Sequence, residues 1–221
     1  SIHEKCFTQL IDIITSKENI MLAYRSIKKN KGSRAKGTNN STIVQMGEKT
    51  PDELVSYVRK RLQNFHPHAV RRVEIPKDIK GEFRKLGVPT VVDRVVQQAI
   101  AQVLTPIYER KFHENSYGFR PGKSAQKAVL KAVEYMNEGY NWVVDIDLEK
   151  FFDTVEHDKL ISVLNKEIKD GKILSLIRKF LVSGVMVGEQ IEETEIGTQQ
   201  GGNISPLLAN ILLNEMDWEL E

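Results

Sequence analysis

The eight residues NWVVDIDL (141–148) constrain the fold of this chain more than any other segment. Their strict alternation predicts a β-strand with apolar side chains at 142, 144, 146 and 148 on one face. Asp145 and Asp147 share the opposite face with Val143, and residues two apart on a strand lie about 7 Å from each other. The segment therefore predicts a strand that presents two carboxylates side by side.

The segments around this strand predict helices that alternate with short strands. Extended runs on either side of Lys80-Gly81 and of Gly188 predict two hairpins. N-cap residues predict helix starts at four places: Thr50 (followed by Pro51, with Glu53 completing a capping box), Thr90, Ser124, and Ser205 followed by Pro206. Such a mixture places the chain in the α+β class.

Charge is distributed unevenly along the chain. Residues 1–130 carry 24 Lys and Arg against 12 Asp and Glu, and residues 131–221 carry 8 against 18. Balances of +12 and −10 thus underlie the net charge of +2. This predicts a basic half that faces nucleic acid, joined to an acidic half. The alternative is that the segments intermix in the fold and the surface field averages out.

Composition excludes several classes of protein. With 40% apolar and 28% charged residues, the chain resembles an ordinary globular protein and not a disordered one. The single Cys6 excludes an internal disulfide and a cysteine-based zinc site. Neither a long apolar run nor a signal peptide is present, so we expect a soluble cytoplasmic protein with no membrane partner.

Residues 28–41 (KKNKGSRAKGTNNS) are basic and rich in Gly, Ser and Asn, which predicts an exposed loop. Its cations suit contact with nucleic-acid phosphates, and a solvated linker is the equally plain alternative.

Four segments together resemble one family. They are FRKLGVPTVVDRVVQQAI (83–100), SYGFRPGKSAQKAV (116–129), VVDIDLEKFFDTVEH (143–157) and GTQQGGNISPLLANILL (197–213). In this order they closely resemble the reverse-transcriptase blocks of group II intron-encoded proteins, also called maturases. The resemblance begins near residue 70, and the preceding helices and basic loop resemble the additional N-terminal block of these enzymes.

This resemblance implies the fold of a right-hand polymerase, with helix-rich fingers, a basic β-hairpin and a small antiparallel palm sheet. It divides the chain into five parts: the N-terminal extension with the basic loop (1–40), the fingers (41–88), the fingers–palm junction with the first palm motif (89–155), helices and a hairpin of the fingers and palm (156–194), and the second palm motif with its helix (195–221).

For the metal, the resemblance implies Asp147 as the catalytic ligand, because it precedes the aromatic Phe152 by five positions. The main chain of Leu148 would lie beside it. The full-length protein would bind two Mg²⁺ ions, which hard oxygen ligands suit. Asp145 shares the predicted strand face, so periodicity alone does not choose between the two carboxylates.

For the incoming deoxynucleotide, Phe152 resembles the steric gate that excludes a ribose 2′-hydroxyl. Lys77 and Arg84 resemble the fingertip cations that grip the triphosphate. Gln200 and Gly201 belong to the glycine-rich loop that lies near the nucleotide. Cations that would bind RNA are Lys28, Lys29, Lys31, Arg34, Lys36, Arg59, Lys60, Arg71, Arg72, Arg120 and Lys123.

The family's Tyr-x-Asp-Asp block is absent from these residues, which contain no adjacent Asp-Asp pair. We therefore expect a part of a longer bacterial protein that binds RNA but does not polymerise alone. The expected function is that of an RNA-directed DNA polymerase that is also a splicing maturase. Its expected partners are group II intron RNA, an RNA template with a DNA primer, and deoxynucleotides, and the sequence leaves a homodimer open.

Two other functions fit the same residues. One is a maturase module that binds RNA without catalysis. The other is a reverse transcriptase of another bacterial lineage, such as a retron, a diversity-generating element or a CRISPR-associated fusion.

Overall fold

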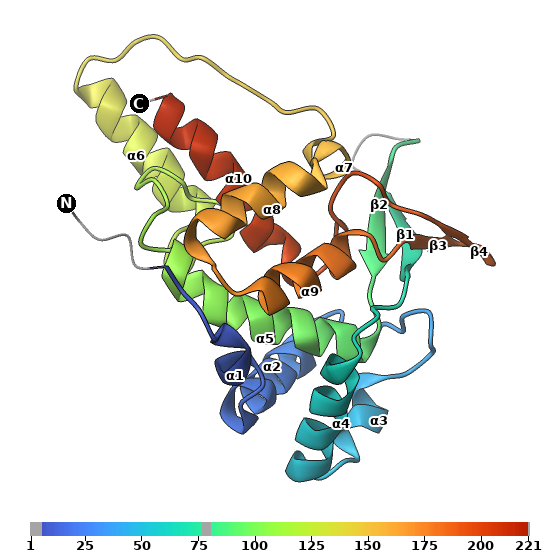
Figure 1. Cartoon of the computed structure of the whole chain (residues 1–221). Helices are drawn as coiled ribbons and strands as arrows, with labels where there is room; N and C mark the ends of the chain where they lie inside the picture. The colour runs from blue at the N-terminus through green and yellow to red at the C-terminus, as the bar shows by residue number, and fades with distance from the viewer. Residues whose placement is uncertain (1–5, 77–80, 221) are drawn as a thin grey trace.

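The long helix α5 (Val91–Tyr108) forms the centre of the protein, which we describe from a computed structural model for residues 6–76 and 81–220. Thr90 caps the helix as predicted, because its hydroxyl accepts a hydrogen bond from the Asp93 amide at 3.4 Å. Figure 1 shows α5 between the blue N-terminal helices and the orange and red C-terminal helices. Both groups of helices contribute to one hydrophobic core, so the two halves of the sequence share their interior.

Four N-terminal helices pack on one side of this core: α1 (Leu10–Ile14), α2 (Lys17–Lys29), α3 (Ile43–Gly47) and α4 (Pro51–Gln63). The predicted capping box at the start of α4 is confirmed, with Thr50 and Glu53 each bonding to the other's backbone amide. On the other side lie α7 (Phe151–Thr154), α8 (His157–Glu167), α9 (Gly171–Leu181) and α10 (Ser205–Glu219). Among the described residues, no helix has the length and apolar character that a membrane span requires.

Both predicted hairpins are present and join in one sheet of order β2-β1-β3-β4. The first hairpin consists of β1 (Val70–Pro76) and β2 (Phe83–Val88), and the second of β3 (Val185–Val187) and β4 (Gln190–Glu192). Each hairpin is antiparallel, whereas β1 and β3 pair in parallel, with Val70 opposite Val185. A strand from late in the chain therefore extends the first hairpin, and the α+β class is confirmed.

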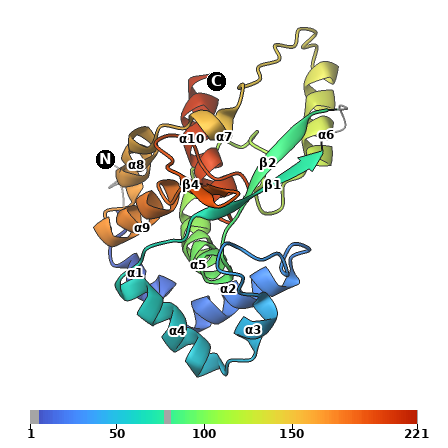
Figure 2. The same ribbon diagram turned by 90° about the vertical axis from the view of Figure 1, so that its right-hand side faces the viewer.

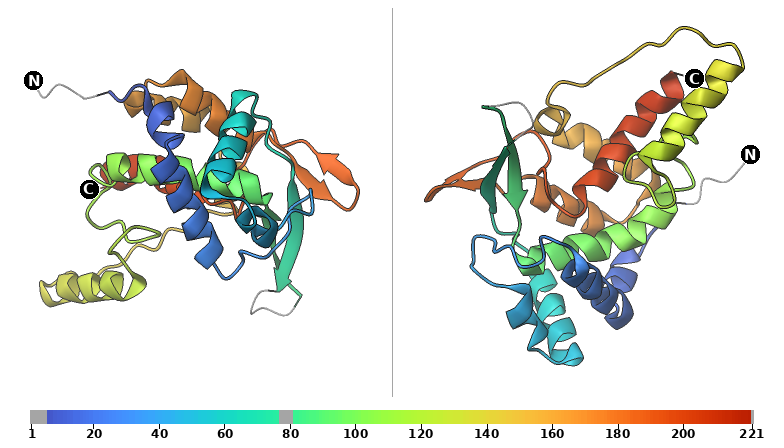
Figure 3. Two further views of the ribbon diagram at one scale, coloured as in Figure 1. Left: turned by 90° about the horizontal axis from the view of Figure 1, so that it is seen from below. Right: turned by 180° about the vertical axis from the view of Figure 1, so that it is seen from behind.

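Helix α6 (Ala125–Asn137) extends away from the body of the molecule, as the view from below in Figure 3 shows. Ser124 caps it as predicted, yet none of its side chains is buried. Val129, Leu130 and Met136 are each 63% exposed. The helix thus has an apolar face that no described residue covers.

The strand predicted at 141–148 is wrong for this structure. The segment forms an extended connection that arches from α6 to α7 (Figures 1 and 2), and Trp142 and Val144 are 95% and 84% exposed. Alternation specifies which face each side chain would take, but a strand also needs a neighbour to accept its hydrogen bonds. Among the described residues, no strand pairs with this segment.

Candidate functional site

A cavity of about 560 Å³ brings three of the predicted nucleotide-binding residues together. Phe152, Gln200 and Gly201 line it, beside the β2–α5 junction and the loop that follows α2. A neighbouring cavity of about 320 Å³ shares Phe152 and Gln200. Phe119 also lines the larger cavity, so residues from five separate parts of the sequence meet at one hollow in the surface.

The glycine-rich loop 197–203 forms one wall of the cavity because it fits tightly between α7 and β2. Gly201 has a φ of +114°, and a Cβ there would lie 2.8 Å from the Gly87 carbonyl oxygen. The Gly87 amide in turn donates to the Gln200 carbonyl at 2.7 Å. The position of Gln200 is thus fixed to the strand β2 through the main chain.

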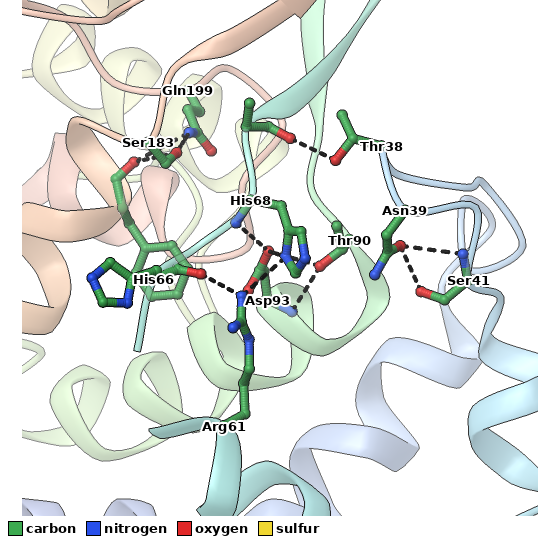
Figure 4. Close-up of polar contacts among 12 residues, drawn as sticks. Thr38, Asn39, Ser41, Arg61, His66, His68, Thr90, Asp93, Ser183 and Gln199 are labelled. Atoms are coloured by element: carbon green, nitrogen blue, oxygen red, sulfur yellow. Dashed lines mark hydrogen bonds and ion pairs between the residues drawn. The ribbon is translucent and has the colours of Figure 1, made fainter. Parts of the chain in front are cut away.

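Polar contacts hold the same loop against the helices on its other side. The Asn203 amide donates to Oε1 of the buried Gln97 on α5 at 2.7 Å. The side chain of Gln199 donates to the Ser183 hydroxyl (Figure 4). Ser205 was predicted to cap α10, but Ile204 occupies the N-cap position. The Ser205 hydroxyl instead donates to the Gln199 carbonyl at 2.7 Å, which stabilises the loop and not the helix end.

Asp145, Asp147 and Leu148 lie on the exposed connection 138–150 and line neither cavity. Within the described residues, no cluster of three or more His, Cys, Asp or Glu side chains could hold a metal ion. The segment does offer two carboxylates and a main-chain carbonyl within four residues. Mg²⁺ commonly takes one or two protein carboxylates and completes its shell with water and phosphate, so this donor set fits that ion.

The cations of the first hairpin divide between its two faces. Lys77 lies outside the described residues. Arg84 is exposed on β2 opposite Ile75, and the neighbouring Lys85 points to the other face, where it lines the smaller cavity with Arg72. Among the described cations of the hairpin, Lys85 and Arg72 are thus the two that line a cavity together with Phe152 and Gln200.

The eleven predicted RNA-binding residues differ in exposure, and Arg71 and Arg72 on β1 are half-buried. The exposed cations are Lys28, Lys29, Lys31, Arg34, Lys36, Arg59 and Lys60. The side chain of Arg120 is only 6% exposed, pairs with Glu109 at 2.8 Å and donates to two carbonyls. Lys123 lies over the Tyr117 ring, with 4.5 Å from its Nζ to the centroid. Arg120 and Lys123 thus have partners within the protein.

A buried network anchors the start of β1 to α5 (Figure 4). The Asp93 carboxylate, 1% exposed, accepts hydrogen bonds from the Thr90 hydroxyl at 2.7 Å and from the His68 amide at 3.0 Å. Arg61 on α4 contacts the His68 ring and the His66 carbonyl. This network fixes the direction in which the hairpin leaves the helical body.

Arg94, the next residue on α5, is a candidate functional residue that the sequence analysis missed. It lines the larger cavity although only 7% of it is exposed, and burial lowers the pKa of its guanidinium. An arginine always remains charged in a protein. A charged residue within the apolar run VVDRVV was the available signal, but the sequence does not show what its guanidinium contacts.

Comparisons with known proteins identify the family of the chain. The family described as "Reverse transcriptase (RNA-dependent DNA polymerase)" matches residues 75–221. The chain is 36% identical to the group II intron-encoded protein LtrA of Lactococcus lactis subsp. cremoris, over 97% of this chain and 35% of that protein. It is 35% identical to protein YkfC of Escherichia coli (strain K12), over 95% of this chain and 56% of that protein.

A solved structure shows the same fold. A chain in a partial Cas6-RT-Cas1–Cas2 complex superposes with a TM-score of 0.61 at 29% identity, covering 96% of this chain and 35% of that chain. The chain described here thus spans about a third of the length of LtrA and of that structure. The predicted resemblance to group II intron-encoded proteins is confirmed, and the chain belongs to the reverse transcriptase family.

Proposed function

We propose that this chain is the nucleotide- and template-facing part of an RNA-directed DNA polymerase that also binds group II intron RNA as a splicing maturase. The observation that carries the proposal is the cavity in which Phe152, Gln200 and Gly201 meet beside cationic segments. A nucleotide-binding site combines an aromatic wall, an amide group, main chain that is accessible at glycine, and positive charge near the phosphates.

Each residue has a distinct role in this proposal. The Phe152 ring excludes the ribose 2′-hydroxyl, and the Gln200 amide orients the incoming deoxynucleotide. Lys85 joins the fingertip cations Lys77 and Arg84 in neutralising the triphosphate. These contacts need no movement of Gln200, because its main chain is already bonded to β2.

Reverse transcriptases use divalent metal ions, and here we assign Mg²⁺ to the Asp147 carboxylate and the Leu148 carbonyl. When bound, Mg²⁺ neutralises charge on the phosphates and lowers the pKa of an attacking hydroxyl. Asp147 presents its carboxylate without an ion pair among the described residues, and Asp145 orients the segment beside it.

The exposed cations of the basic loop and of α4 provide the RNA contact of the proposal. A polyanion exchanges its counterions for such side chains, so binding weakens as salt is added. We expect the 221 residues to bind RNA without polymerising, because one carboxylate segment supplies only part of a two-metal site.

Primer extension by the full-length protein tests the polymerase, with an RNA template, deoxynucleotides and Mg²⁺. Asp147→Ala should abolish extension and Asp145→Ala should only reduce it. Asp158→Ala, an exposed carboxylate on α8, is the matched control and should retain activity. Equal loss in Asp145→Ala and Asp147→Ala would contradict the assignment of the metal ligand.

The steric gate has its own test in the same assay. Phe152→Ala should increase ribonucleotide incorporation about 10–100-fold, because removing a clash relaxes specificity more than it weakens binding. Unchanged discrimination in this variant would remove Phe152 from the ribose pocket.

The non-catalytic maturase remains the second candidate, because the carboxylate segment lines neither cavity. Tight, salt-sensitive binding to intron RNA without primer extension by the full-length protein would favour it.

A further inference from the structure

Arg94 satisfies its charge in an unusual way, by holding the main chain of the basic loop. Its Nη1 donates to the carbonyls of Gly32 and Ser33 at 3.2 and 3.3 Å, and its Nη2 donates to the Ala35 carbonyl at 2.6 Å. Among the described residues, no carboxylate forms an ion pair with it. Three carbonyls of one loop therefore replace the acidic partner that a buried arginine usually has.

The geometry of the side chain explains why this residue is an arginine. A guanidinium presents five donors in a rigid planar fork, so it can reach several carbonyls at once. A lysine ammonium is a single point charge and could not span the same three acceptors without moving the loop. The arrangement therefore fixes the shape of the loop as well as its position.

Further contacts hold the part of the loop that directly follows the carbonyls bonded to Arg94. The Arg71 Nε donates to the Lys36 carbonyl at 2.9 Å, and the Thr38 hydroxyl donates to the Ala69 carbonyl at 3.0 Å. Gly37 packs so closely that a Cβ there would lie 2.6 Å from the Thr90 Cα. The loop is thus a docked segment and not the solvated linker that composition allowed.

Docking the main chain leaves the charged side chains free to face outward. Lys31, Arg34 and Lys36 are all exposed, while Gly32 and Ala35 line the larger cavity with Arg94. Figure 2 shows this blue loop, between α2 and α3, beside α5 and the base of β1 and β2. The exposed cations are therefore next in sequence to residues that line the cavity together with Phe152 and Gln200.

We propose that Arg94 is a positioning residue for RNA binding, which holds Lys31, Arg34 and Lys36 as a preformed row of positive charge at the mouth of the nucleotide cavity. The inference rests on the proposed function, since it assigns the loop to an RNA strand. A loop already ordered in the free protein pays no ordering entropy when the strand binds, and this raises affinity without any new contact.

A double-mutant cycle distinguishes positioning from direct contact with RNA. Four forms of the 221-residue chain are titrated with a single-stranded RNA oligonucleotide. They are the wild type, Arg94→Gln, the neutralised variant in which Lys31, Arg34 and Lys36 are all changed to Gln, and the neutralised variant that also carries Arg94→Gln. In the wild-type background Arg94→Gln should weaken binding about tenfold, the cost of ordering a released loop. In the neutralised background it should change binding less than twofold. Equal losses in both backgrounds would overturn the proposal, because Arg94 would then act independently of the loop.

Arg110→Gln is the matched control, since it removes one positive charge from an exposed site just after α5. It should weaken binding much less than Arg94→Gln does. Arg94→Lys keeps the charge but not the planar fork, so we expect it to restore only part of the affinity. Full rescue by lysine would show that charge alone matters and would contradict positioning.

Hydrogen exchange gives a readout that does not depend on RNA. The Ala35 amide, which donates to the Gly32 carbonyl at 3.0 Å, should exchange at least tenfold faster in Arg94→Gln, while amides of α5 stay protected. Unchanged protection of the loop would overturn the proposal. If the wild-type chain failed to bind RNA while exchange was faster in the variant, the proposed function would be refuted. Such a result would still show that Arg94 holds the loop in place.

Gly37→Ala covers the case in which Arg94→Gln does not fold. Its added methyl group pushes the loop away from Thr90 while Arg94 stays intact. The same acceleration of exchange and the same loss of affinity are expected, and wild-type affinity with a released loop would overturn the proposal.

Discussion

Gly201 shows how a single residue decides the shape of the site. Its φ of +114° belongs to a region that residues with a Cβ rarely adopt, and the Gly87 carbonyl occupies the space that a side chain would need. Both constraints act on the loop that carries Gln200. The glycine therefore stabilises the one conformation in which this loop can approach β2.

Gly201→Ala should lower the free energy of unfolding by about 1–3 kcal/mol through backbone strain. It should also weaken deoxynucleotide binding in the full-length protein, because Gln200 must move. Urea unfolding measures the first effect, and a nucleotide titration measures the second. Gly122→Ala provides the comparison, since Gly122 also has a positive φ but has open space around it. A larger effect on nucleotide binding at Gly122 than at Gly201 would contradict this account.

The resemblance assigned Phe152, Gln200 and Gly201 to nucleotide binding, and all three line one cavity, while their roles there stay a prediction. It did so because their motifs are local and specific. Arg94 was missed since its three partners lie about 60 residues away along the chain. A pattern of residue types does not report which main-chain carbonyls surround a buried charge.

Helices and strands were predicted unequally well. Helix starts followed their caps closely, because a cap acts within four residues. The strand at 141–148 had the clearest alternation in the sequence and is absent, since pairing depends on a partner elsewhere. The prediction for Ser205 is correct only in part. Helix α10 begins at Ser205, but the Ser205 hydroxyl bonds to the glycine-rich loop and does not cap the helix.

The capping box of α4 gives a prediction about stability. Thr50→Ala should lower the free energy of unfolding by about 1 kcal/mol, as loss of an N-cap does, while Ser56→Ala on the same helix should change it little. Urea unfolding of both variants at pH 7 is the measurement. Equal stability of Thr50→Ala and the wild type would show that the cap is not formed in solution.

Acid should remove part of this stabilisation. Hydrogen bonds from the Thr50 amide and hydroxyl lower the pKa of Glu53 below its usual 4.5. A carboxyl whose pKa is lowered by folding stabilises the protein above its unfolded pKa, and the contribution disappears as pH falls through the folded value. The stability difference between wild type and Glu53→Gln should therefore shrink below pH 4.5.

At the scale of the whole molecule, the basic and acidic halves of the sequence do not form separate bodies. Strand β3 pairs with β1, and α8, α9 and α10 share the core with α5. Segments from the two halves thus intermix in the fold, which was the alternative to a separate basic half. The positive charge that we propose for RNA binding is accordingly local, on the docked loop and on α4.

RNA affinity should depend on salt through that loop. Each phosphate contact of a single strand changes the slope of log affinity against log salt by about 0.7, so changing Lys31, Arg34 and Lys36 to Gln should flatten it by about 2. The same charge change at Lys159, Lys169 and Lys172, which are exposed on the other side of the core, should leave the slope nearly unchanged. Equal flattening by both triple variants would show that only total charge attracts the RNA.

The parallel pairing of Val70 with Val185 has a consequence for synthesis on the ribosome. When β1 and β2 emerge, the edge that β3 will cover stays unpaired, because β3 begins 97 residues after the end of β2. Contacts so distant in sequence form slowly, and an open strand edge can pair with other chains in the meantime. The nascent protein is therefore most exposed to aggregation or chaperone capture in the interval between these two strands.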